Sequence, residues 1–309
     1  MKVITLPASL DERYFEPLVR GLDAAGTRRV LFDGTHGRWV NPYGLIGLLV
    51  LGRVARERSG EAPLLKLPEN PEVVSYMSRM SFFEHAEAIF ELHGGGRRAR
   101  HDGESDVLLE ITAVNSHADV HSVVDLVNQR GMRILTTQLH YPVREAFQFS
   151  VILSEVCQNI IEHAETGGWV ATQTYNWAKT LGRKVVVIAV MDLGVGFRQS
   201  LAPTHAARFE QWTDAAALEA AFRHGHTRHH DPGRGQGIQQ IRRQVARWGG
   251  RITIRSGSAR IADVPAWDDS PALEEGLPTL PGAQIGIVLP ARVAAEQPGR
   301  EPVAARRQE

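Results

Sequence analysis

Cysteine is almost missing from the sequence, and other common features are missing with it. Cys157 is the only cysteine among 309 residues, which excludes an intramolecular disulfide and is typical of proteins in a reducing compartment. No apolar run approaches the roughly 20 residues of a membrane-spanning helix. Pro7, Asp11 and Glu12 interrupt the N-terminal stretch where a secretory signal is continuously apolar. We therefore expect a cytoplasmic protein that does not bind membranes.

An excess of one charge is missing as well. The 35 basic residues balance 35 acidic ones, so the composition gives no electrostatic reason to expect nucleic-acid binding. The length leaves room for two domains, each with a core of its own. We therefore look for function in local motifs.

The most informative motif follows the apolar run 185–190. This run predicts a buried strand, and Asp192, Gly194 and Gly196 come directly after it. Ligands often bind where strands of an α/β layer end. A carboxylate there can accept a hydrogen bond from an exocyclic amine such as that of adenine, and glycines let the backbone pass close to a flat ring. Alone, the pattern also fits a tight turn.

A second motif lies in the segment 147–164, which has the apolar spacing of an amphipathic helix. Glu155, Asn159 and His163 are four residues apart, so they share one side of that helix. The Asn159 amide oxygen is a suitable ligand for Mg²⁺, and the Glu155 carboxylate can act as a base on a water or hydroxyl. Viewed alone, the same residues fit a solvent-facing polar edge.

A third motif is glycine-rich and runs into a helix predicted over 238–248. Gly233, Gly235 and Gly237 alternate, with Arg234 between the first two. Free backbone N–H groups at a helix N-terminus favour a phosphate. The spacing is neither that of a P-loop nor that of the dinucleotide fingerprint.

Taken in order, the three motifs resemble the nucleotide-binding boxes of the GHKL ATPase/kinase superfamily, which includes gyrase, ninety-kilodalton chaperones, histidine kinases and MutL. The helix 147–164 is similar to the N box, the segment 192–196 to the G1 box, and the segment 233–237 to the G2 box. The segment 281–290 looks like the closing strand, with Ala283 where a threonine is common. The resemblance spans 107–292 and implies binding of ATP or ADP with Mg²⁺. It also implies an α/β sandwich with helices on one face of a mixed sheet and a mobile lid.

Within that superfamily, the spacing of Glu155, Asn159 and His163 most resembles the serine-kinase type found in anti-sigma factors. A histidine kinase would carry an H-box upstream, and His117, His121 and His140 lack its sequence context. Gyrase and MutL proteins have a transducer domain, whereas a short tail follows here. The resemblance therefore favours a small kinase or a nucleotide-gated binding module.

Strand patterns support this fold separately. Residues 169–177 alternate as a half-exposed strand should, and 251–256 alternate again after two glycines. The segment 181–184 has the composition of a turn into the strand 185–190. We expect a sheet made mostly of antiparallel hairpins.

The N-terminal third alternates strands with helices, which indicates a β/α layer. The glycine-rich, charged stretch 93–104 is typical of a linker. The predicted strands are 2–6, 29–33 and 64–67, and the predicted helices are 12–25, 42–58 and 71–85. We expect four parts: an N-terminal domain over 1–93, a linker over 94–106, an ATP-binding domain over 107–292 and a disordered tail over 293–309.

The N-terminal domain resembles the STAS fold of anti-sigma-factor antagonists. The resemblance rests on the strand ending at Asp33, the turn 41–45 at a helix start, and the segment 80–83. Tyr43 stands where that family has its phosphoacceptor serine, so we expect no phospho-switch of the family's form. The alternative is an unrelated accessory β/α domain that docks on the ATPase part.

The region between Phe197 and Gly233 corresponds to the ATP lid of the superfamily, with a helix predicted over 211–222. Thr227 and Arg228 are candidates for contacts to the β- and γ-phosphates. Four histidines follow the helix and could bind a metal, although a solvated lid end explains them as well. They are His224, His226, His229 and His230. The segment 259–282 is expected to be an exposed acidic loop.

Three functions remain open from the sequence. The first is an ATP- and Mg²⁺-binding regulatory protein of the serine/threonine-kinase or anti-sigma type. The second is a nucleotide-gated interaction module with negligible turnover, and the third is an ATPase without a protein phosphoacceptor. Phosphoryl transfer relies on positioning and charge neutralisation, so few residues separate them. Expected partners are an adenine nucleotide, a regulatory protein and, in one arrangement, a second copy of the chain.

Overall fold

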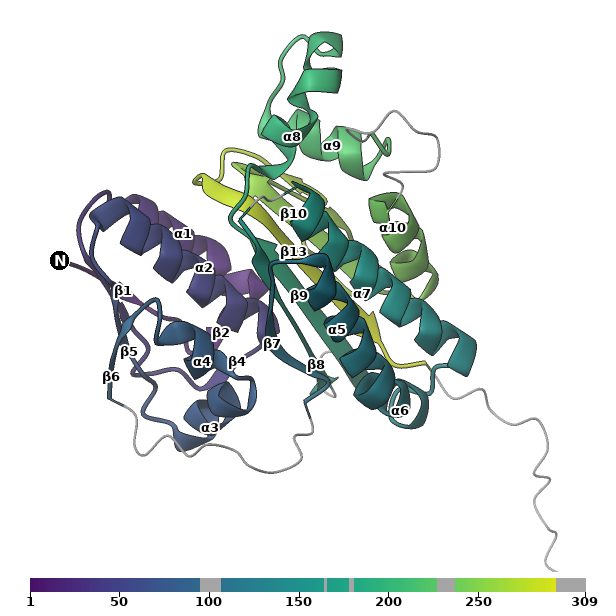
Figure 1. Ribbon diagram of the computed structural model, residues 1–309, viewed down its shortest axis with the longest axis horizontal. Coiled ribbons are helices and arrows are strands. Elements are labelled where there is room, and N and C mark those ends of the chain that lie inside the picture. The colour runs from purple at the N-terminus through teal and green to yellow at the C-terminus, as the bar shows by residue number, and fades with distance from the viewer. Residues whose placement is uncertain (95–106, 164–165, 178–180, 227–236, 293–309) are drawn as a thin grey trace, which may run out of the picture.

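The computed structural model describes residues 1–94, 107–163, 166–177, 181–226 and 237–292. Within them the chain forms a four-stranded parallel sheet in an N-terminal domain (residues 1–94) and a seven-stranded antiparallel sheet after it (Figure 1). This mixed α/β architecture confirms the predicted fold class. None of the described helices combines the length and apolarity that a membrane span needs.

The N-terminal domain has parallel strands in the order β1-β3-β5-β6, and its helices cover them. The strands are β1 (Lys2–Thr5), β3 (Val30–Asp33), β5 (Leu64–Lys66) and β6 (Glu91–His93), with a small separate pair, β2 (Ser9–Leu10) and β4 (Trp39–Val40). The helices are η1 (Glu12–Tyr14), α1 (Phe15–Asp23), α2 (Pro42–Ser59), α3 (Pro71–Arg79) and α4 (Phe82–Ala86).

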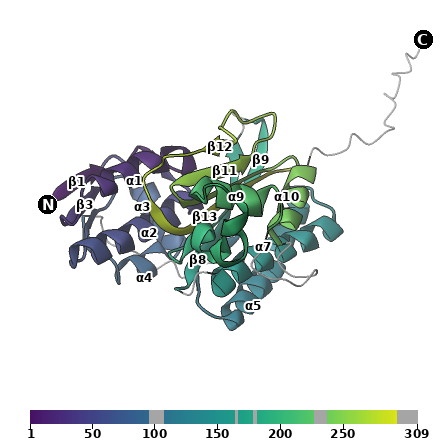
Figure 2. The same ribbon diagram turned by 90° about the horizontal axis from the view of Figure 1, so that it is seen from above.

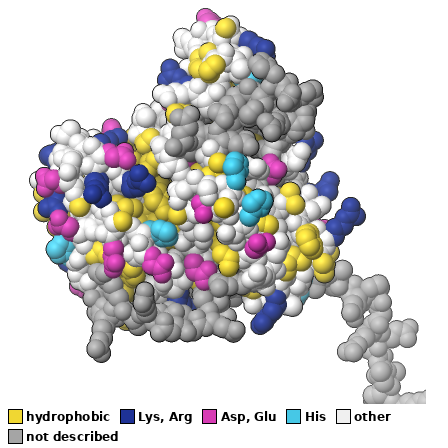
Figure 3. Space-filling model, in the orientation of Figure 1, with side chains coloured by type: hydrophobic (Ala, Val, Ile, Leu, Met, Phe, Trp, Pro, Cys, Tyr) yellow, Lys and Arg dark blue, Asp and Glu magenta, His cyan; other side chains and the backbone are white. Residues whose placement is uncertain are grey.

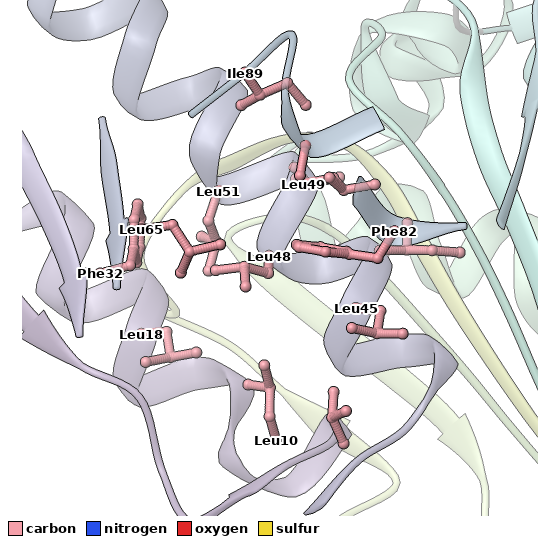
Figure 4. Close-up of a cluster of buried hydrophobic side chains, with 14 of the residues drawn as sticks. Leu10, Leu18, Phe32, Leu45, Leu48, Leu49, Leu51, Leu65, Phe82 and Ile89 are labelled. Carbon is pink, nitrogen blue, oxygen red and sulfur yellow. The ribbon is translucent and has the colours of Figure 1, made fainter. Parts of the chain in front are cut away.

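Helix α2 is the centre of this domain, and all of its first eleven residues are buried. Asn41 caps it by accepting a hydrogen bond from the Gly44 N–H at 2.9 Å. Leu45, Leu48 and Leu49 meet side chains from the sheet and from α1 and α4 (Figure 4). A helix that is apolar all round must be covered on every side, and α2 is covered on its second side by the antiparallel sheet.

The antiparallel sheet has the order β12-β11-β10-β13-β9-β8-β7. Its strands are β7 (Leu109–Val114), β8 (Gly168–Trp177), β9 (Arg183–Asp192), β10 (Arg251–Gly257), β11 (Ala259–Asp263), β12 (Leu273–Glu274) and β13 (Leu280–Pro290). Every strand pair in it is antiparallel, as the alternating patterns predicted.

Helices cover one face of this sheet. They are α5 (His117–Leu126), η2 (Val127–Gly131), α6 (Met132–Thr137), α7 (Val143–His163) and α10 (Gly237–Arg247). Val186, Ile188 and Val190 of β9 point to this side and join a core with Phe149 and Val156 of α7. Beyond the sheet end lie α8 (Gly196–His205), η3 (Ala206–Arg208) and α9 (Asp214–Phe222).

The N-terminal domain covers the opposite face, as the two views in Figures 1 and 2 show. Trp169 and Ala171 of β8 and Ala189 and Met191 of β9 belong to the same core cluster as α2. The prediction of a half-exposed strand over 169–177 is therefore wrong for its first part, since residues 168–173 are buried on both faces. The alternation of side chains was correct, but the domain that covers the second face was not visible in it.

Two other predictions need correction. The helix predicted over 71–85 is broken after α3, because Ser81 adopts the left-handed conformation with φ 55°. The stretch 259–282 is not wholly an exposed loop, because it contains β11 and β12. Asp268 within that stretch is largely buried and pairs with Arg251. Strands β2, β4, β6 and β7 and helices α5, α6 and α8 were not predicted.

Candidate functional site

A pocket lies where β9 ends, between helix α7 and the helices α8 and α9 beyond the end of the sheet. Strands β9 and β13 supply its floor through Val190, Asp192 and Ile285. Helix α7 supplies one wall, and α8, α9 and the start of α10 supply the rest. Most of the lining is apolar, with a few polar groups among it, as is common in small-molecule sites.

Asp192 is the charged group of this pocket. It is 8% exposed, and its Oδ1 accepts hydrogen bonds from the backbone N–H groups of Gly194 at 2.8 Å and Ala283 at 3.3 Å. Burial raises the pKa of the Asp192 carboxyl to about 6, although these two bonds oppose the rise. Both bonds end on Oδ1, so within the described residues Oδ2 keeps its capacity to accept another.

The backbone around Asp192 leaves no room for side chains at two glycines. Gly282 has φ 77°, and a Cβ there would lie 2.1 Å from the Asp192 carbonyl oxygen. Gly196 has φ 69°, and a Cβ there would lie 2.7 Å from Ser256 Oγ. The Ser256 hydroxyl donates to the Gly282 carbonyl at 2.8 Å and accepts from the Phe197 N–H at 3.1 Å. Ser256 thus joins the G1-like turn to the strand that holds Ala283.

Helix α7 brings two of its polar residues to the same region. Asn159 lines the pocket, and its buried Nδ2 has no hydrogen-bond partner among the described residues. Glu155 lies one turn earlier and is half-buried. A Cβ at Gly237 would lie 2.7 Å from Glu155 Oε2, so the first residue of α10 packs against this carboxylate. An amide and a carboxylate one turn apart therefore face the glycine-rich end of α10.

The lid histidines are partly described. His226 lines the pocket and stacks on His205 with ring centroids 4.7 Å apart, and the His224 ring lies 6.0 Å from His226. Burial lowers the pKa of His226, and the two neighbouring histidines lower it further. Across the described part of the chain, no group of three or more His, Cys, Asp or Glu side chains could hold a metal ion.

The structure brings together the predicted residues that it describes. Asn159, Asp192 and Gly196 line one pocket, Gly194 binds Asp192, and Gly237 lies against Glu155. His163 belongs to α7, but its side chain is outside the described residues. Also outside them are Thr227, Arg228, His229, His230, Gly233, Arg234 and Gly235.

Sequence reasoning missed several groups at the pocket. Ser256 has the alternation of an ordinary strand residue, and its role depends on the pairing of β10 with β13. Phe197 and Ser200 belong to α8, which was not predicted. Gly282 had a signal, since a Pro-Gly pair before an apolar run marks a turn.

Comparison with known protein families agrees with the geometry of this pocket. Residues 146–276 match the family model described as histidine kinase-, DNA gyrase B-, and HSP90-like ATPase. Over these residues the chain therefore contains a domain of this family, which confirms the GHKL part of the resemblance. The matched range includes most of α7, the end of β9 and α10. No curated protein matches the chain.

The residues present fit an adenine nucleotide with Mg²⁺. The buried Nδ2 of Asn159 has no hydrogen-bond partner among the described residues, so it can donate to a ligand atom. The turn of Gly196 and Gly282 forms a cradle that side chains would fill. Asp192 keeps an acceptor oxygen at the pocket floor. An oxygen-donor set of amide and carboxylate suits a hard divalent cation.

Proposed function

We propose that this chain is an ATP- and Mg²⁺-binding regulatory protein of the GHKL type, with serine/threonine-kinase-like or anti-sigma-like activity. The observation that carries the proposal is the buried Asp192 carboxylate, held by the N–H groups of Gly194 and Ala283 at the floor of an apolar pocket. Such a carboxylate offers the acceptor that the exocyclic amine of adenine needs. The ATPase family match supports nucleotide binding in general.

The roles we propose follow the chemistry of each group. Asp192 accepts the adenine amine, and Gly194 and Gly196 let the backbone approach the ring. The Asn159 amide oxygen is the metal ligand, and the Glu155 carboxylate beside it is the proton acceptor. When bound, magnesium and nucleotide supply the phosphoryl group and the charge neutralisation that phosphoryl transfer needs.

The remaining proposed contacts are to the phosphates. They fall to His163, Thr227, Arg228, Gly233, Arg234, Gly235 and Gly237. The start of α10 at Gly237 supports this, because a helix N-terminus favours an anion. The alternatives of a nucleotide-gated module and of an ATPase without a protein acceptor use the same residues.

We further propose that the N-terminal domain is STAS-like and regulates the ATPase part from within the chain. The parallel order β1-β3-β5-β6 with α1 and α2 beside it supports this. So does the contact between the two parts, because Arg255 of β10 pairs with Glu16 of α1 while the next residue, Ser256, binds the G1-like turn. A covalent link between them raises the effective concentration of one for the other.

Incubation with γ-labelled ATP and Mg²⁺, following free phosphate and labelled protein together, tests the proposal. A kinase labels a protein, an ATPase releases phosphate, and a gated module does neither while still binding ATP. Glu155→Ala should leave ATP affinity nearly intact and lower any turnover about a hundredfold or more, the usual size of a general-base contribution. Full turnover in Glu155→Ala would show that this carboxylate is not the base.

A further inference from the structure

The outer side of α7 carries a line of large apolar side chains that the fold does not use. Val143, Phe147 and Val151 are 63%, 57% and 55% exposed. Their spacing of four residues puts them in one row on the helix. Figure 3 shows hydrophobic surface over this end of α7, at the lower right. Single exposed apolar residues are ordinary, but a contiguous row of three marks an interaction surface.

Helix α10 runs antiparallel beside this row. Gly237 at its start lies against Glu155, whereas Trp248, just past its end, packs on Tyr141 with ring centroids 5.4 Å apart. Because Tyr141 lies two residues before the start of α7, the C-terminal half of α10 lies beside the N-terminal half of α7. The exposed residues on that half of α10 therefore flank the apolar row.

Those flanking residues are basic. Arg243 and Arg247 are exposed, and among the described residues neither has an ion-pair partner. Within the described ranges, the Arg243 guanidinium donates only to the Gln239 carbonyl, at 3.2 Å. Figure 3 shows dark blue side chains just beyond the hydrophobic area, on the side where α10 lies. Two unpaired cations therefore border the row on one side.

The other charged residues near the row do not change the net positive charge on its α10 side. Arg144 is exposed next to Val143. The Glu145 carboxylate is neutralised by Arg292, with Nη2 and Oε2 2.6 Å apart. Asp125 is exposed on the α5 side. The rim is therefore net basic on the α10 side and carries a single acid on the other.

We propose that this α7–α10 face (Val143, Phe147, Val151, Arg243 and Arg247) binds an acidic amphipathic helix of a partner protein. The apolar residues of such a helix, at i, i+3, i+4 and i+7, would cover the row, and its acids would meet the two arginines. Charge complementarity of this kind selects the partner and speeds association.

Other occupants fit the face less well. A second copy packed through the same face would bring its own arginines against these, and like charges across an interface are costly. A flat anionic membrane would also meet the exposed acid Asp125 of α5. The chain's own segment 293–309 has three arginines and three glutamates with Pro298 and Pro302, so it is neither acidic nor suited to a helix.

The test uses the full-length chain and a labelled synthetic helix with leucine at i, i+3, i+4 and i+7 and glutamate elsewhere. Fluorescence anisotropy should detect binding, and Phe147→Ser should weaken it about tenfold or more, as loss of an interface anchor does. Arg243→Glu with Arg247→Glu should weaken it similarly. That double variant should instead gain affinity for the same helix with lysine in place of glutamate. Tyr14→Ser, at an aromatic 47% exposed on the other domain, and Arg20→Glu are the matched controls and should change nothing.

The contrary results are equally distinct. Undiminished binding in Phe147→Ser, or binding lost equally in Tyr14→Ser, would overturn the proposal. If the acidic helix fails to bind while phosphatidylserine–phosphatidylcholine vesicles retain the protein through Phe147, the face is a membrane surface instead. If sedimentation shows a dimer that Phe147→Ser dissolves, the occupant is a second copy. Loss of nucleotide binding would leave this proposal untouched, because the face lies outside the pocket.

Discussion

The two faces of the antiparallel sheet share apolar packing but differ in charge. On the helical side, β9 presents aliphatic residues such as Ile188 to α7, and the contact is a hydrophobic core. On the other side, β8 and β9 add apolar side chains such as Met191 to the core around α2, while β10 presents Arg251, Thr253 and Arg255 to the N-terminal domain. The second face thus adds buried ion pairs to its apolar contacts.

The ion pairs of the second face are specific in geometry. Arg255 is fully buried, and its Nε lies 2.7 Å from Glu16 Oε1. Arg251 joins Glu12 at 2.5 Å and Asp268 at 2.9 Å. Buried ion pairs often contribute little net stability, because desolvation offsets their attraction. Here they fix where α1 lies on the sheet, whereas the apolar contacts on both faces contribute the stability.

The largest effect should come from breaking one of these pairs. Glu16→Ala leaves the Arg255 guanidinium buried with only the carbonyls of Pro278 and Gly257 as partners. We expect the free energy of unfolding to fall by about 3–5 kcal/mol, measured by urea denaturation. Glu57→Ala, at an exposed acid of α2, is the control and should change it little.

A double replacement sharpens the same comparison. Glu16→Met with Arg255→Met removes both charges and keeps the volume, so its stability should return near that of the parent protein. If Glu16→Ala costs less than about 1 kcal/mol, the pair is solvated and our view of this face is wrong.

On the helical face, we expect the buried Asp192 carboxylate to lower the stability of the fold while it favours ATP binding. Asp192→Asn keeps an oxygen for the N–H groups of Gly194 and Ala283 but replaces the free acceptor with a donor. We expect ATP to bind more weakly by about 1–3 kcal/mol, and GTP to bind poorly to the parent protein, since guanine offers a carbonyl there. Calorimetry measures both. Equal affinity of the parent protein for ATP and GTP would refute the role of Asp192.

The pKa of Asp192 gives the stability side of this prediction. In the folded protein it is about 6, above the ordinary value of 3.8, so the folded state holds a proton that the unfolded state releases between these pH values. The contribution of this group to stability therefore falls as pH rises from about 4 to about 6. Asp192→Asn should remove that fall and be more stable than the parent at pH 7, whereas ATP affinity of the parent should drop below pH 6.

A smaller effect is expected at Asn159. Asn159→Ala removes the proposed metal ligand. The increase in ATP affinity that Mg²⁺ causes should therefore be about tenfold smaller in this variant than in the parent protein. Stability should change little, because the buried Nδ2 makes no hydrogen bond within the described residues. Gln158→Ala, the neighbouring residue on α7, is the control. Titration with and without Mg²⁺ measures the difference, and an unchanged Mg²⁺ effect in Asn159→Ala would contradict the assignment.

The two faces also differ in how well the sequence predicts them. Asp192 and Asn159 were predictable, because a strand end and a helix spacing are local patterns. Ser256 was not, since its partners Gly282 and Phe197 are brought to it by strand pairing and by α8. Arg255 has the appearance of an exposed strand residue, and only the docked α1 makes it buried. Local chemistry was thus predictable, whereas burial depends on the domain packed against it.

At Tyr43 we expect neither phosphorylation nor an effect on ATP binding. Its side chain is 3% exposed, its ring meets Phe15 edge-on with centroids 5.4 Å apart, and a Cβ at Gly286 would lie 3.2 Å from Cδ2. Burial raises its pKa well above the ordinary range, and the carboxylates of Glu12 and Glu16 add to this. A phosphate at this position would place a dianion beside two buried acids, which the interface cannot hold.

Mass spectrometry after incubation with Mg²⁺ and ATP should therefore find no phosphate within residues 41–45, and Tyr43→Phe should bind ATP as the parent does. Phosphotyrosine at Tyr43 would mean that the N-terminal domain leaves the sheet during the reaction, and that the ion-paired face is a transient contact.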